Sequence, residues 1–389
     1  MKIMVKELGE IITGNTPSKK IEEFWNSEDI WFVKPDLIPE VGVNVIKHSN
    51  EYISENARKK ARVVNQNAIF VTCIGSIGKI GIAAEGEFAF NQQINAIVPN
   101  ERVNAKYLAY NLHYNKPRLI AIANAPVVPI INKTQFGEFF ISIETDLEKQ
   151  SEVVEVLDRL ALIIEQRHNE LSALDNLIKS RFIELFGSLN DNEKGLDILP
   201  IEELCTLIKD GTHQTPIYTD DQQNGFKFLS SKDVMTQEIC WDEIKYIPAE
   251  LHEKLYATIQ PIRNDILMSK NGVNYGVAAV NDTDEIFDIY VSLALLRPKT
   301  DKVNPVYLRC AINNLDTKRQ FDSSIKGIGV PNLHLGEIKK TKILVPSMDK
   351  QNAFVAFVEQ VDKSKVVFMY YITLFYDIIF LRCWGQKSL

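Results

Sequence analysis

The chain has 389 residues, 45% of them hydrophobic, and a formal net charge of -7. This length is too great for one ordinary core and suits two domains with a connecting scaffold. The acidic balance argues against DNA binding through overall charge, and there is no basic tail, so any DNA contact would need local basic patches. The five cysteines are scattered and include no C-x-x-C pair, which argues against a disulfide framework and a zinc site.

The N-terminus and the apolar stretches predict a cytoplasmic protein without a membrane partner. The N-terminal sequence MKIMVKELGE lacks the apolar core of a signal peptide. The longest apolar stretch, Tyr370 to Leu381, is interrupted by Asp377 and is too short to span a bilayer.

Residues 1–146 predict a globular α+β part with a mostly antiparallel sheet, because many short strand-like runs accompany only one or two helices. A polar loop that ends in proline, Thr13–Lys20, precedes a strand-like run, Ile30–Leu37. Asn67–Ala83 combines β-branched residues with a glycine turn, which predicts a hairpin. A helix is expected over Val103–Leu112.

The glycine cluster of that hairpin, Gly75–Gly81, does not match a phosphate-binding P-loop. Its sequence, GSIGKIG, lacks the GxxxxGK followed by Ser or Thr that the motif requires. A tight turn is the favoured interpretation. Lys79, and Lys270 in the second half of the chain, could still reach phosphate groups from such turns.

Residues 147–187 predict a single long helix with a coiled-coil seam. The segment contains no proline, and its only glycine, Gly187, stands where a helix C-cap is expected. Arg167 and Arg181 occupy two polar positions of a series with alternating steps of four and three residues. The apolar members of that series are Val153, Leu157, Leu160, Ile164, Leu171, Leu174, Ile178 and Leu185.

The rest of the chain repeats these parts. Residues 188–346 form a second globular part, in which Asp210–Tyr218 matches the first polar loop and Asn264–Ala279 matches the first hairpin. Residues 347–389 form a second long helix, in which Lys350-Gln351 matches Lys149-Gln150 at a shift of 201 positions. The same shift gives a second seam of Phe354, Val358, Val361, Lys365, Phe368, Ile372, Phe375, Ile379 and Arg382.

The order of the parts predicts how the helices pair. The first helix leads from the first globular part to the second, so the second helix must run back to bury its seam against the first. We therefore expect a long antiparallel two-helix coiled coil that joins two pseudo-symmetric globular parts, with domain limits of 1–146, 147–187, 188–346 and 347–389.

The chain carries no recognisable catalytic pattern. The Pro-Asp and Glu-x-Lys elements of a metal nuclease are not paired at a usable distance, and an Asn-Pro-Pro-aromatic tetrapeptide and a G-x-S-x-G elbow are both missing. The histidines show no metal spacing, and for His213 a functional contact and an ordinary turn remain open. We expect a binding protein that is not an enzyme and holds no cofactor or metal of its own.

The second helix is apolar nearly all round over Phe368–Trp384, more than a two-helix seam can bury. Two interpretations remain open. The additional apolar face could contact the adjacent globular part, or partner helices could dock on it. For the second interpretation we expect partner contacts at Phe368, Tyr371, Phe375 and Ile379.

Together these features resemble the specificity subunit of type I restriction–modification enzymes. The resemblance covers essentially the whole chain and rests on residues 14–37, 73–83, 174–187, 210–216 and 330–351. The last helix departs most from the family pattern.

The resemblance implies that each globular part is a target recognition domain and that the chain reads a bipartite site in double-stranded DNA. It implies that the helices are spacers that bind two methyltransferase subunits, joined in a full restriction complex by two restriction/translocase subunits. Adenine methylation and DNA cleavage would belong to these partners, which would hold S-adenosylmethionine, ATP and Mg²⁺.

We expect the polar loops to contact DNA, with lysines on phosphates and with Gln, Asn, Ser and Thr on base edges. The candidates are Thr16, Ser18, Lys19, Lys20, Lys34, Lys79, Asn132 and Lys133 in the first part, and Thr212, His213, Gln214, Thr215, Ser231, Lys232, Lys270, Asn271 and Lys326 in the second. The competing hypothesis is a rigid two-headed adaptor that binds proteins and has no DNA specificity, which the acidic charge favours slightly.

Overall fold

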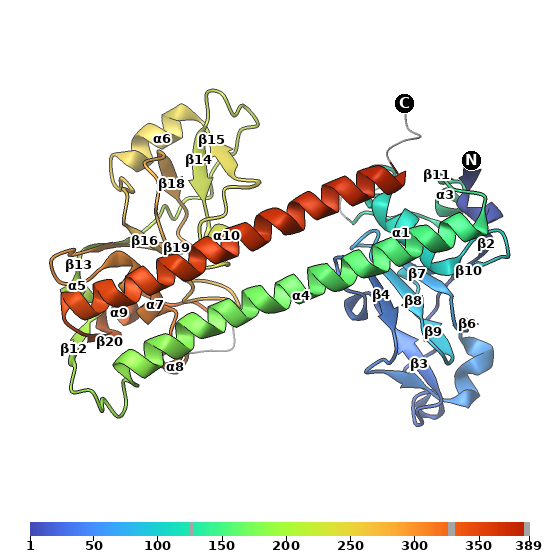
Figure 1. Cartoon of the computed structure of the whole chain (residues 1–389), viewed down its shortest axis with the longest axis horizontal. Coiled ribbons are helices and arrows are strands. Elements are labelled where there is room, and N and C mark those ends of the chain that lie inside the picture. Colours follow the sequence, from blue (N-terminus) through green and yellow to red (C-terminus); the bar gives the residue numbers. More distant parts are fainter. Residues whose placement is uncertain (124–127, 326–330, 385–389) are drawn as a thin grey trace. The chain divides into compact units, whose positions relative to one another are not determined.

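The computed structural model describes residues 1–123, 128–325 and 331–384, with side chains as far as residue 366. The chain divides into two compact units. Unit 1 comprises Met1–Asn169 and Met369–Leu389, and unit 2 comprises Glu170–Phe368. Each unit has its own sheets (Figure 1). Each unit also has its own hydrophobic cores.

Unit 1 is built on two larger sheets. Its strands are β1 (Lys2–Met4), β2 (Gly9–Thr13), β3 (Ile30–Val33), β4 (Val43–Ile46), β5 (Tyr52–Ile53), β6 (Val63–Val64), β7 (Ile69–Thr72), β8 (Ile80–Ala83), β9 (Phe88–Phe90), β10 (Ile94–Pro99) and β11 (Phe140–Ser142). The sheet orders are β2-β10-β7-β8-β4 and β5-β3-β9-β6, and β1 pairs with β11. The pairs β3–β9 and β4–β8 are parallel, and the other pairs are antiparallel.

Apart from its shares of the two long helices described below, the helices of unit 1 are short. They are α1 (Ala105–Tyr114), α2 (Lys116–Ala121), α3 (Lys133–Gly137) and the 3-10 turns η1 (Val5–Glu7), η2 (Glu22–Phe24), η3 (Pro35–Leu37) and η4 (Glu55–Lys60). β7 is an unbroken run of β-branched and aromatic residues because both of its faces are buried. Ile69 and Val71 share a core with α1, while Phe70 packs with Phe88 and Phe90 of the other sheet.

Unit 2 repeats this plan with fewer strands. Its elements are β12 (Asp197–Pro200), α5 (Ile201–Leu204), β13 (Cys205–Asp210), β14 (Phe226–Leu229), η5 (Ser231–Val234), β15 (Lys245–Ile247), α6 (Ala249–Tyr256), β16 (Ile266–Ser269), β17 (Ala278–Val280), β18 (Phe287–Ile289), β19 (Leu293–Pro298), α7 (Pro305–Ile312), α8 (Leu315–Ser324), α9 (Leu335–Lys340) and β20 (Lys342–Val345). The sheet orders are β13-β19-β16-β17 and β15-β14-β18, and β12 pairs with β20. The strand order β2-β10-β7-β8 of unit 1 thus recurs as β13-β19-β16-β17.

The predicted mixed helix-and-sheet class with two domains is confirmed. Both expected hairpins are present, as the antiparallel pairs β7–β8 and β16–β17. The helix expected over Val103–Leu112 is present as α1. Asn67 and Asn264 precede β7 and β16 with φ of 69° and 73°, a backbone region in which asparagine is enriched. The repeat therefore extends to the turn residues.

Two long helices are shared between the units. These are α4 (Leu147–Phe186) and α10 (Met348–Trp384). Gly187 follows α4 with φ of +76°, and its N–H donates to the carbonyl of Ile183 at 2.7 Å, as expected of a glycine cap.

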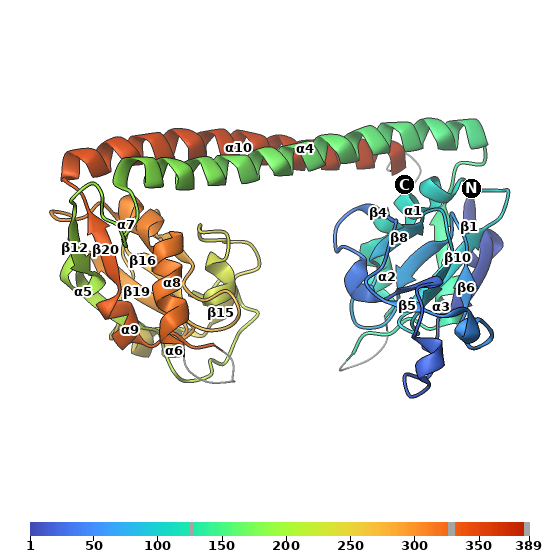
Figure 2. The same cartoon turned by 90° about the horizontal axis from the view of Figure 1, so that it is seen from below.

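Within unit 2 the two long helices run in opposite directions. Phe182 and Phe354 have ring centroids 5.5 Å apart, and Asp175 accepts an ion pair from Lys365 at 2.6 Å. The two helices are therefore antiparallel within unit 2, as predicted. Figure 2 shows α7 between these helix ends and the sheet that contains β16 and β19.

Every residue of the predicted α4 seam, from Val153 to Leu185, is buried or half-buried. Most α4 residues that lie between the seam positions are exposed. One detail differs at the C-terminal end of α4. Phe182 and Phe186 are the most buried residues there, one position after the predicted Arg181 and Leu185. The reason is that this end packs against Tyr307 of α7 as well as against α10.

The start of each long helix is attached to its neighbouring globular part in the same way. The buried side chain of Gln150 accepts from the N–H of Asn104 at 2.8 Å and donates to the carbonyl of Glu144 at 2.7 Å. Gln351 accepts from the N–H of Asn304 at 2.8 Å and donates to the carbonyl of Pro346 at 2.8 Å. The matched Lys-Gln pairs of the sequence therefore mark a repeated structural joint.

Candidate nucleic-acid interface

In unit 1 three loops meet at a short segment between β9 and β10, residues 91–93, here called crossover 1. The N–H of Asn15, just after β2, donates to the carbonyl of Phe90 at 2.9 Å. The N–H of Asn91 donates to the carbonyl of Val33 at 3.1 Å, at the end of β3, and the N–H of Cys73, after β7, donates to the carbonyl of Gln93 at 2.8 Å. Crossover 1 therefore gathers the candidate loops after β2, β3 and β7.

In unit 2 the corresponding segment between β18 and β19, residues 290–292 or crossover 2, has the same arrangement. The N–H of Thr212 donates to the carbonyl of Ile289 at 3.1 Å, and the N–H of Tyr290 donates to the carbonyl of Leu229 at 2.9 Å. The N–H of Lys270 donates to the carbonyl of Ser292 at 2.8 Å. The loops after β13, β14 and β16 therefore meet as their counterparts do in unit 1.

A glycine permits the close approach in both units. A Cβ on Gly14 would lie 2.1 Å from the carbonyl oxygen of Asn91, and a Cβ on Gly211 would lie 2.1 Å from that of Ile289. No other residue fits against these backbones without displacing the loop. The glycines of the predicted TGNTP and DGTHQTP loops are thus framework residues, and the polar residues after them provide the variable surface.

The side chains on this shared framework differ. In unit 1 the exposed Thr16 hydroxyl donates to Oε1 of Gln92 at 2.9 Å, which places two polar groups side by side on crossover 1. In unit 2 the hydroxyl of Thr212 instead accepts from the N–H of Gln214 at 3.2 Å. Gln214 and Thr215 are exposed beyond it. The two units therefore present different donors and acceptors from one backbone plan.

Two of the predicted lysines of unit 1 share one carboxylate. Lys34 forms an ion pair with Glu51, and Nζ of Lys19 lies 3.6 Å from the other oxygen of the same carboxylate. Lys19 also lies over the ring of Trp25, at 5.3 Å from its centroid. Ser18 contributes its carbonyl, which accepts from the Trp25 indole N–H at 3.3 Å.

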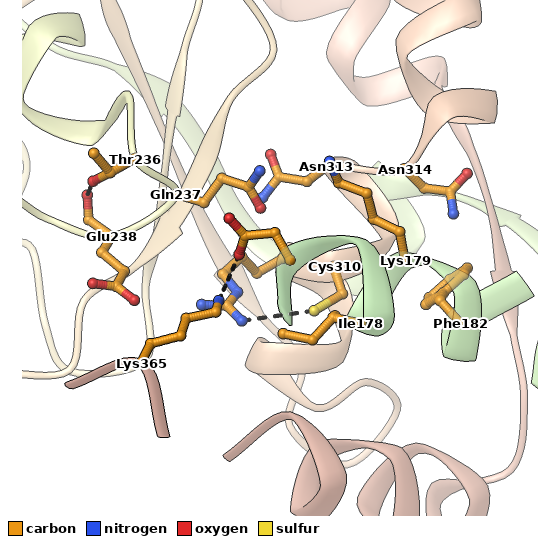
Figure 3. A pocket seen from close by; sticks show the side chains of 12 residues that line it. Ile178, Lys179, Phe182, Thr236, Gln237, Glu238, Cys310, Asn313, Asn314 and Lys365 are labelled. Carbon is orange, nitrogen blue, oxygen red and sulfur yellow. Dashed lines mark hydrogen bonds and ion pairs between the residues drawn. The ribbon is translucent and has the colours of Figure 1, made fainter. Parts of the chain in front are cut away.

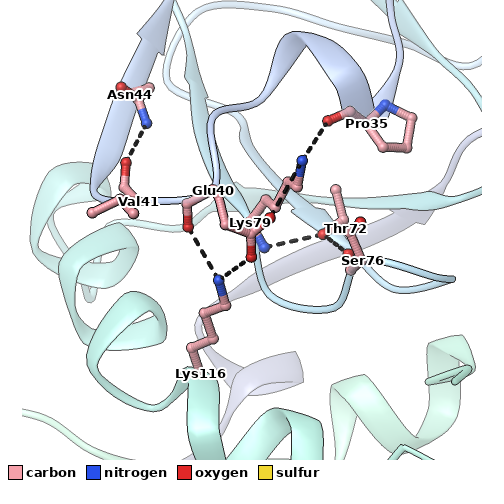
Figure 4. Close-up of polar contacts among 8 residues, drawn as sticks. All are labelled: Pro35, Glu40, Val41, Asn44, Thr72, Ser76, Lys79 and Lys116. Atoms are coloured by element: carbon pink, nitrogen blue, oxygen red, sulfur yellow. Dashed lines mark hydrogen bonds and ion pairs between the residues drawn. The ribbon is translucent and has the colours of Figure 1, made fainter. Parts of the chain in front are cut away.

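A second carboxylate, Glu40, also holds two lysines. Its oxygens lie 3.4 Å from Nζ of Lys79 and 2.6 Å from Nζ of Lys116, and Figure 4 shows the three side chains converging beside Pro35. The hydrogen bond from Lys116 is the main cause of a lowered pKa for Glu40. The side chain of Lys79 is only 15% exposed.

The third bridge is in unit 2 and is buried. Lys270 is 6% exposed, and its ammonium lies 2.7 Å from the carboxylate of Asp210, which also lies 3.4 Å from Nε2 of the exposed His213. Burial raises the pKa of Asp210, but the hydrogen bond and charge of Lys270 outweigh it, so that pKa is lowered. The ion pair with Asp210 therefore holds the Lys270 ammonium inside the protein.

Lys79 and Lys270 are not equivalent residues. The hydroxyl of Thr72 accepts from the N–H of Lys79 at 3.0 Å, and the hydroxyl of Ser269 accepts from the N–H of Val277 at 3.0 Å. Lys79 therefore corresponds to Val277, at the far end of the turn. Lys270 corresponds to Cys73, which donates the matching backbone hydrogen bond.

The remaining candidates fall into three groups. Lys20, Lys133 and Lys232 are exposed, and only Lys232 has a carboxylate nearby within the described chain, Asp233 at 3.6 Å. Asn132 caps α3 by accepting from the N–H of Gln135 at 2.9 Å, so its oxygen already has a structural role. The half-buried candidates are Ser231, whose N–H donates to the Ser292 hydroxyl at 3.0 Å, and Asn271.

Several calls lie outside the described part of the structure. Lys326 lies outside the described residues. The side chains of Phe368, Tyr371, Phe375 and Ile379 also lie outside them, although the backbone there is helical. Partner binding at these positions stays a prediction.

Sequence reasoning missed two features of unit 1. The first is Gln92, which sits on crossover 1 beside Thr16 and could have been noticed as a polar pair, Gln92-Gln93, between two strands. The second is a basic run at residues 58–62, in which Lys59, Lys60 and Arg62 are exposed. The carbonyl of Lys60 accepts from the side chain of Asn15 at 2.5 Å, so this run borders the candidate loop.

A small pocket in unit 2 joins α4, α7 and α10. Its volume is about 40 Å³, and its lining includes Lys179, Arg309 and Lys365 (Figure 3). Lys365 bridges Asp175 at 2.6 Å and Asp362 at 2.9 Å. These contacts attach the helices to one another, and the pocket has room for little more than water.

Within the described residues, no group of three or more His, Cys, Asp or Glu side chains could hold a metal ion. No helix in the same residues is long and apolar enough to cross a membrane.

Comparisons with known proteins agree with this geometry. Residues 1–173 and 193–368 match the family described as type I restriction modification DNA specificity domain. The type I restriction enzyme MjaIX specificity subunit of Methanocaldococcus jannaschii is 24% identical over 364 residues, which cover 88% of this chain and 82% of that protein. The MjaVIII specificity subunit of the same organism is 20% identical over 325 residues, covering 78% and 74%.

A solved chain from work on complex assembly and conformational transition of the type I R-M system is 15% identical. It aligns with a TM-score of 0.52 over 98% of this chain and 95% of that one, which shows a shared fold. Since the family match takes in both globular parts and most of both long helices, the chain belongs to the family of type I restriction–modification DNA specificity proteins.

Proposed function

We propose that the chain reads a bipartite DNA target, with one half-site contacted by each unit. The observation that carries this proposal is the repeated backbone framework at crossovers 1 and 2, which bears different side chains in the two units. A common framework presents its variable loops in the same way to a duplex, and different donors and acceptors select different base edges.

We further propose that α4 and α10 form an antiparallel coiled coil that fixes the spacing between the half-sites. Support comes from the unbroken length of both helices and from their opposite directions within unit 2. A rigid connection makes the half-site separation a property of the protein, as it is for dimeric DNA-binding proteins.

The chemistry is assigned to partners in this proposal. Two methyltransferase subunits would dock on the long helices and methylate adenine with S-adenosylmethionine. In a complete restriction complex, two restriction/translocase subunits would use ATP and Mg²⁺ to cleave DNA. The chain itself would be non-catalytic and would act in the cytoplasm.

The test is co-expression of the chain with its methyltransferase subunit in cells that lack other adenine methylation, followed by mapping of methylated adenines. We expect one motif made of two specified half-sites and an unspecified spacer of constant length. A methylated motif with a single continuous element would contradict the two-reader proposal. Complex formation without sequence-dependent methylation would favour the protein-binding adaptor instead.

Two variants assign the half-sites to the units. Gln92→Ala removes a polar group from crossover 1, and Gln214→Ala removes one from the loop at crossover 2. Each variant should lose about 1–3 kcal/mol of discrimination between the correct and the wrong base at one position of one half-site. The other half-site should be methylated with unchanged specificity. If both variants relaxed the same half-site, the division of labour between the units would be wrong.

A further inference from the structure

Two exposed carboxylates of unit 1 each hold a pair of lysines beside the candidate DNA-binding loops. Glu51 holds Lys19 and Lys34, and Glu40 holds Lys79 and Lys116. The two bridges are close in the fold, because Nζ of Lys79 also reaches the carbonyl of Pro35 at 3.5 Å, next to Lys34. The two bridges are therefore neighbours in unit 1, and each pair of lysines shares a single negative group.

These bridges contribute little to the fold. The side chain of Glu51 is 37% exposed and that of Glu40 is 60% exposed, while the side chains of Lys34, Lys79 and Lys116 are 30%, 15% and 18% exposed. Ion pairs whose carboxylate is open to solvent are worth about 0–1 kcal/mol. The buried Asp210–Lys270 pair of unit 2 differs in this respect, since its loss would leave a buried charge without a partner. The exposed bridges can therefore open at small cost when a stronger anion arrives.

A carboxylate between two lysines uses the same ammonium donors that a backbone phosphate would need. While the bridge is closed, the lysine charge is largely cancelled at a distance, and the carboxylate repels DNA. Sequence-independent DNA binding depends almost wholly on lysine and arginine contacts to phosphates. A closed bridge consequently weakens the attraction of the surface for duplexes of any sequence.

Building on the proposed function, we infer that Glu40 and Glu51 are specificity-determining residues that stand in for phosphates until a cognate duplex seats on unit 1. On non-cognate DNA the bridges stay closed and the four lysines contribute little. On cognate DNA the base contacts hold the backbone close enough to displace the carboxylates, and the lysines then bind phosphates. Specificity is gained because the lysine contacts form only in the cognate complex.

The experiment uses the full chain assembled with its methyltransferase subunits. A duplex that carries the mapped motif is compared with a scrambled duplex of the same length over a range of salt concentrations. Glu51→Gln removes the negative charge with little change in shape. Glu250→Gln is the matched control, since it removes the same charge from an exposed pair with Lys254, 2.8 Å away on α6.

Glu51→Gln should tighten binding to the scrambled duplex by about threefold to tenfold and steepen its log–log salt dependence by about one, the value for one added phosphate contact. Binding to the motif should change less than twofold, so the specificity ratio falls. Glu40→Gln should act in the same direction, and the double variant should add the two effects. Glu250→Gln should change both duplexes little and equally.

Two results would overturn the inference, and the variant Lys34→Gln separates them. If Lys34→Gln weakens binding while Glu51→Gln leaves the scrambled duplex unchanged, the stand-in role is wrong and the DNA-binding role of unit 1 stands. If Lys34→Gln and Glu51→Gln are both without effect on either duplex, this side of unit 1 does not contact DNA. That result would contradict both the proposed DNA-binding surface of unit 1 and the inference.

Discussion

Units 1 and 2 share one backbone plan and differ in how their basic side chains are held. In unit 1 the bridging carboxylates are open to solvent, at 37% and 60% exposure, and each one holds two lysines. In unit 2 the corresponding loops are joined by Lys270 and Asp210, of which the lysine is 6% exposed and the aspartate 19%. The comparison teaches that a lysine in a candidate loop can pair with a solvent-open carboxylate in one copy and with a largely buried one in the other.

The helix joints differ in a similar way. The polar contacts of Gln150 and Gln351 are the same, but the apolar packing beside them is not. In unit 2 Phe354 is fully buried against Phe182, Phe186 and Tyr307. The position that matches Phe354 in unit 1 is the half-buried Val153. The joint in unit 2 is therefore the more strongly packed of the two.

The largest effect should come from that joint. Phe354→Ala removes a fully buried ring from a cluster of three others and should lower the free energy of unfolding of unit 2 by about 4 kcal/mol, whereas Val153→Ala should cost unit 1 about 1 kcal/mol. Hydrogen exchange followed by mass spectrometry, in increasing urea, reports the two units separately. Equal losses in the two units would mean that the aromatic cluster does not distinguish the joints.

The next effect concerns the buried bridge. Asp210→Asn leaves the Lys270 ammonium without its partner and should destabilise unit 2 by about 3 kcal/mol, while Glu51→Gln should change the stability of unit 1 by less than about 1 kcal/mol. Chemical denaturation at neutral pH measures both values. The double variant Asp210→Asn with Lys270→Met should recover much of the loss, and a double variant as unstable as the single one would contradict the ion pair as the cause.

This effect also has a pH signature. Since the pKa of Asp210 is below its ordinary value of 3.8, its contribution is present above that value and is lost as the pH falls through the lowered pKa of the folded state. The difference between the natural protein and Asp210→Asn should therefore shrink in acid.

The smallest effect is a pH dependence of stability that comes from His113 of unit 1. The counterpart of His113 in unit 2 is Asn313, which does not titrate. Burial, with the nearby charge of Lys116, lowers the pKa of His113 to about 4. The unfolded chain therefore takes up this proton first, and unit 1 should lose stability as the pH falls from about 6.5 towards 4, by about 2 kcal/mol at pH 5. His113→Asn, which introduces the residue of unit 2, should remove this loss. An unchanged pH profile in the variant would assign the acid sensitivity to other groups.

Much of the fold follows from local sequence signals. The seam of α4, the glycine cap at Gly187 and the two hairpins depend on side-chain period, backbone freedom and β-branched runs, all of which are readable along the chain. The Lys-Gln repeat at residues 149–150 and 350–351 also proved to mark one joint built twice.

The candidate site was predicted less completely, because its chemistry depends on which side chains meet. The partner carboxylates separate Lys270 from Lys79, since Asp210 is 19% exposed and Glu40 is 60% exposed, although both lysines belong to glycine-containing turns of matched hairpins. The side-chain oxygen of Asn132 is used to cap α3. Gln92 of crossover 1 contacts Thr16, although the two residues lie far apart in sequence. Pairings of this kind cannot be read from residue type or spacing alone.

The sequence by itself determined the duplication, the two long helices and the positions of the polar loops, because period and repetition are properties of neighbouring residues along one chain. Only the tertiary structure decided that crossovers 1 and 2 gather those loops, and that Glu40, Glu51 and Asp210 each hold two basic groups. The physical reason is that charge pairing and desolvation depend on distance and burial in space, which strand order fixes and linear spacing does not.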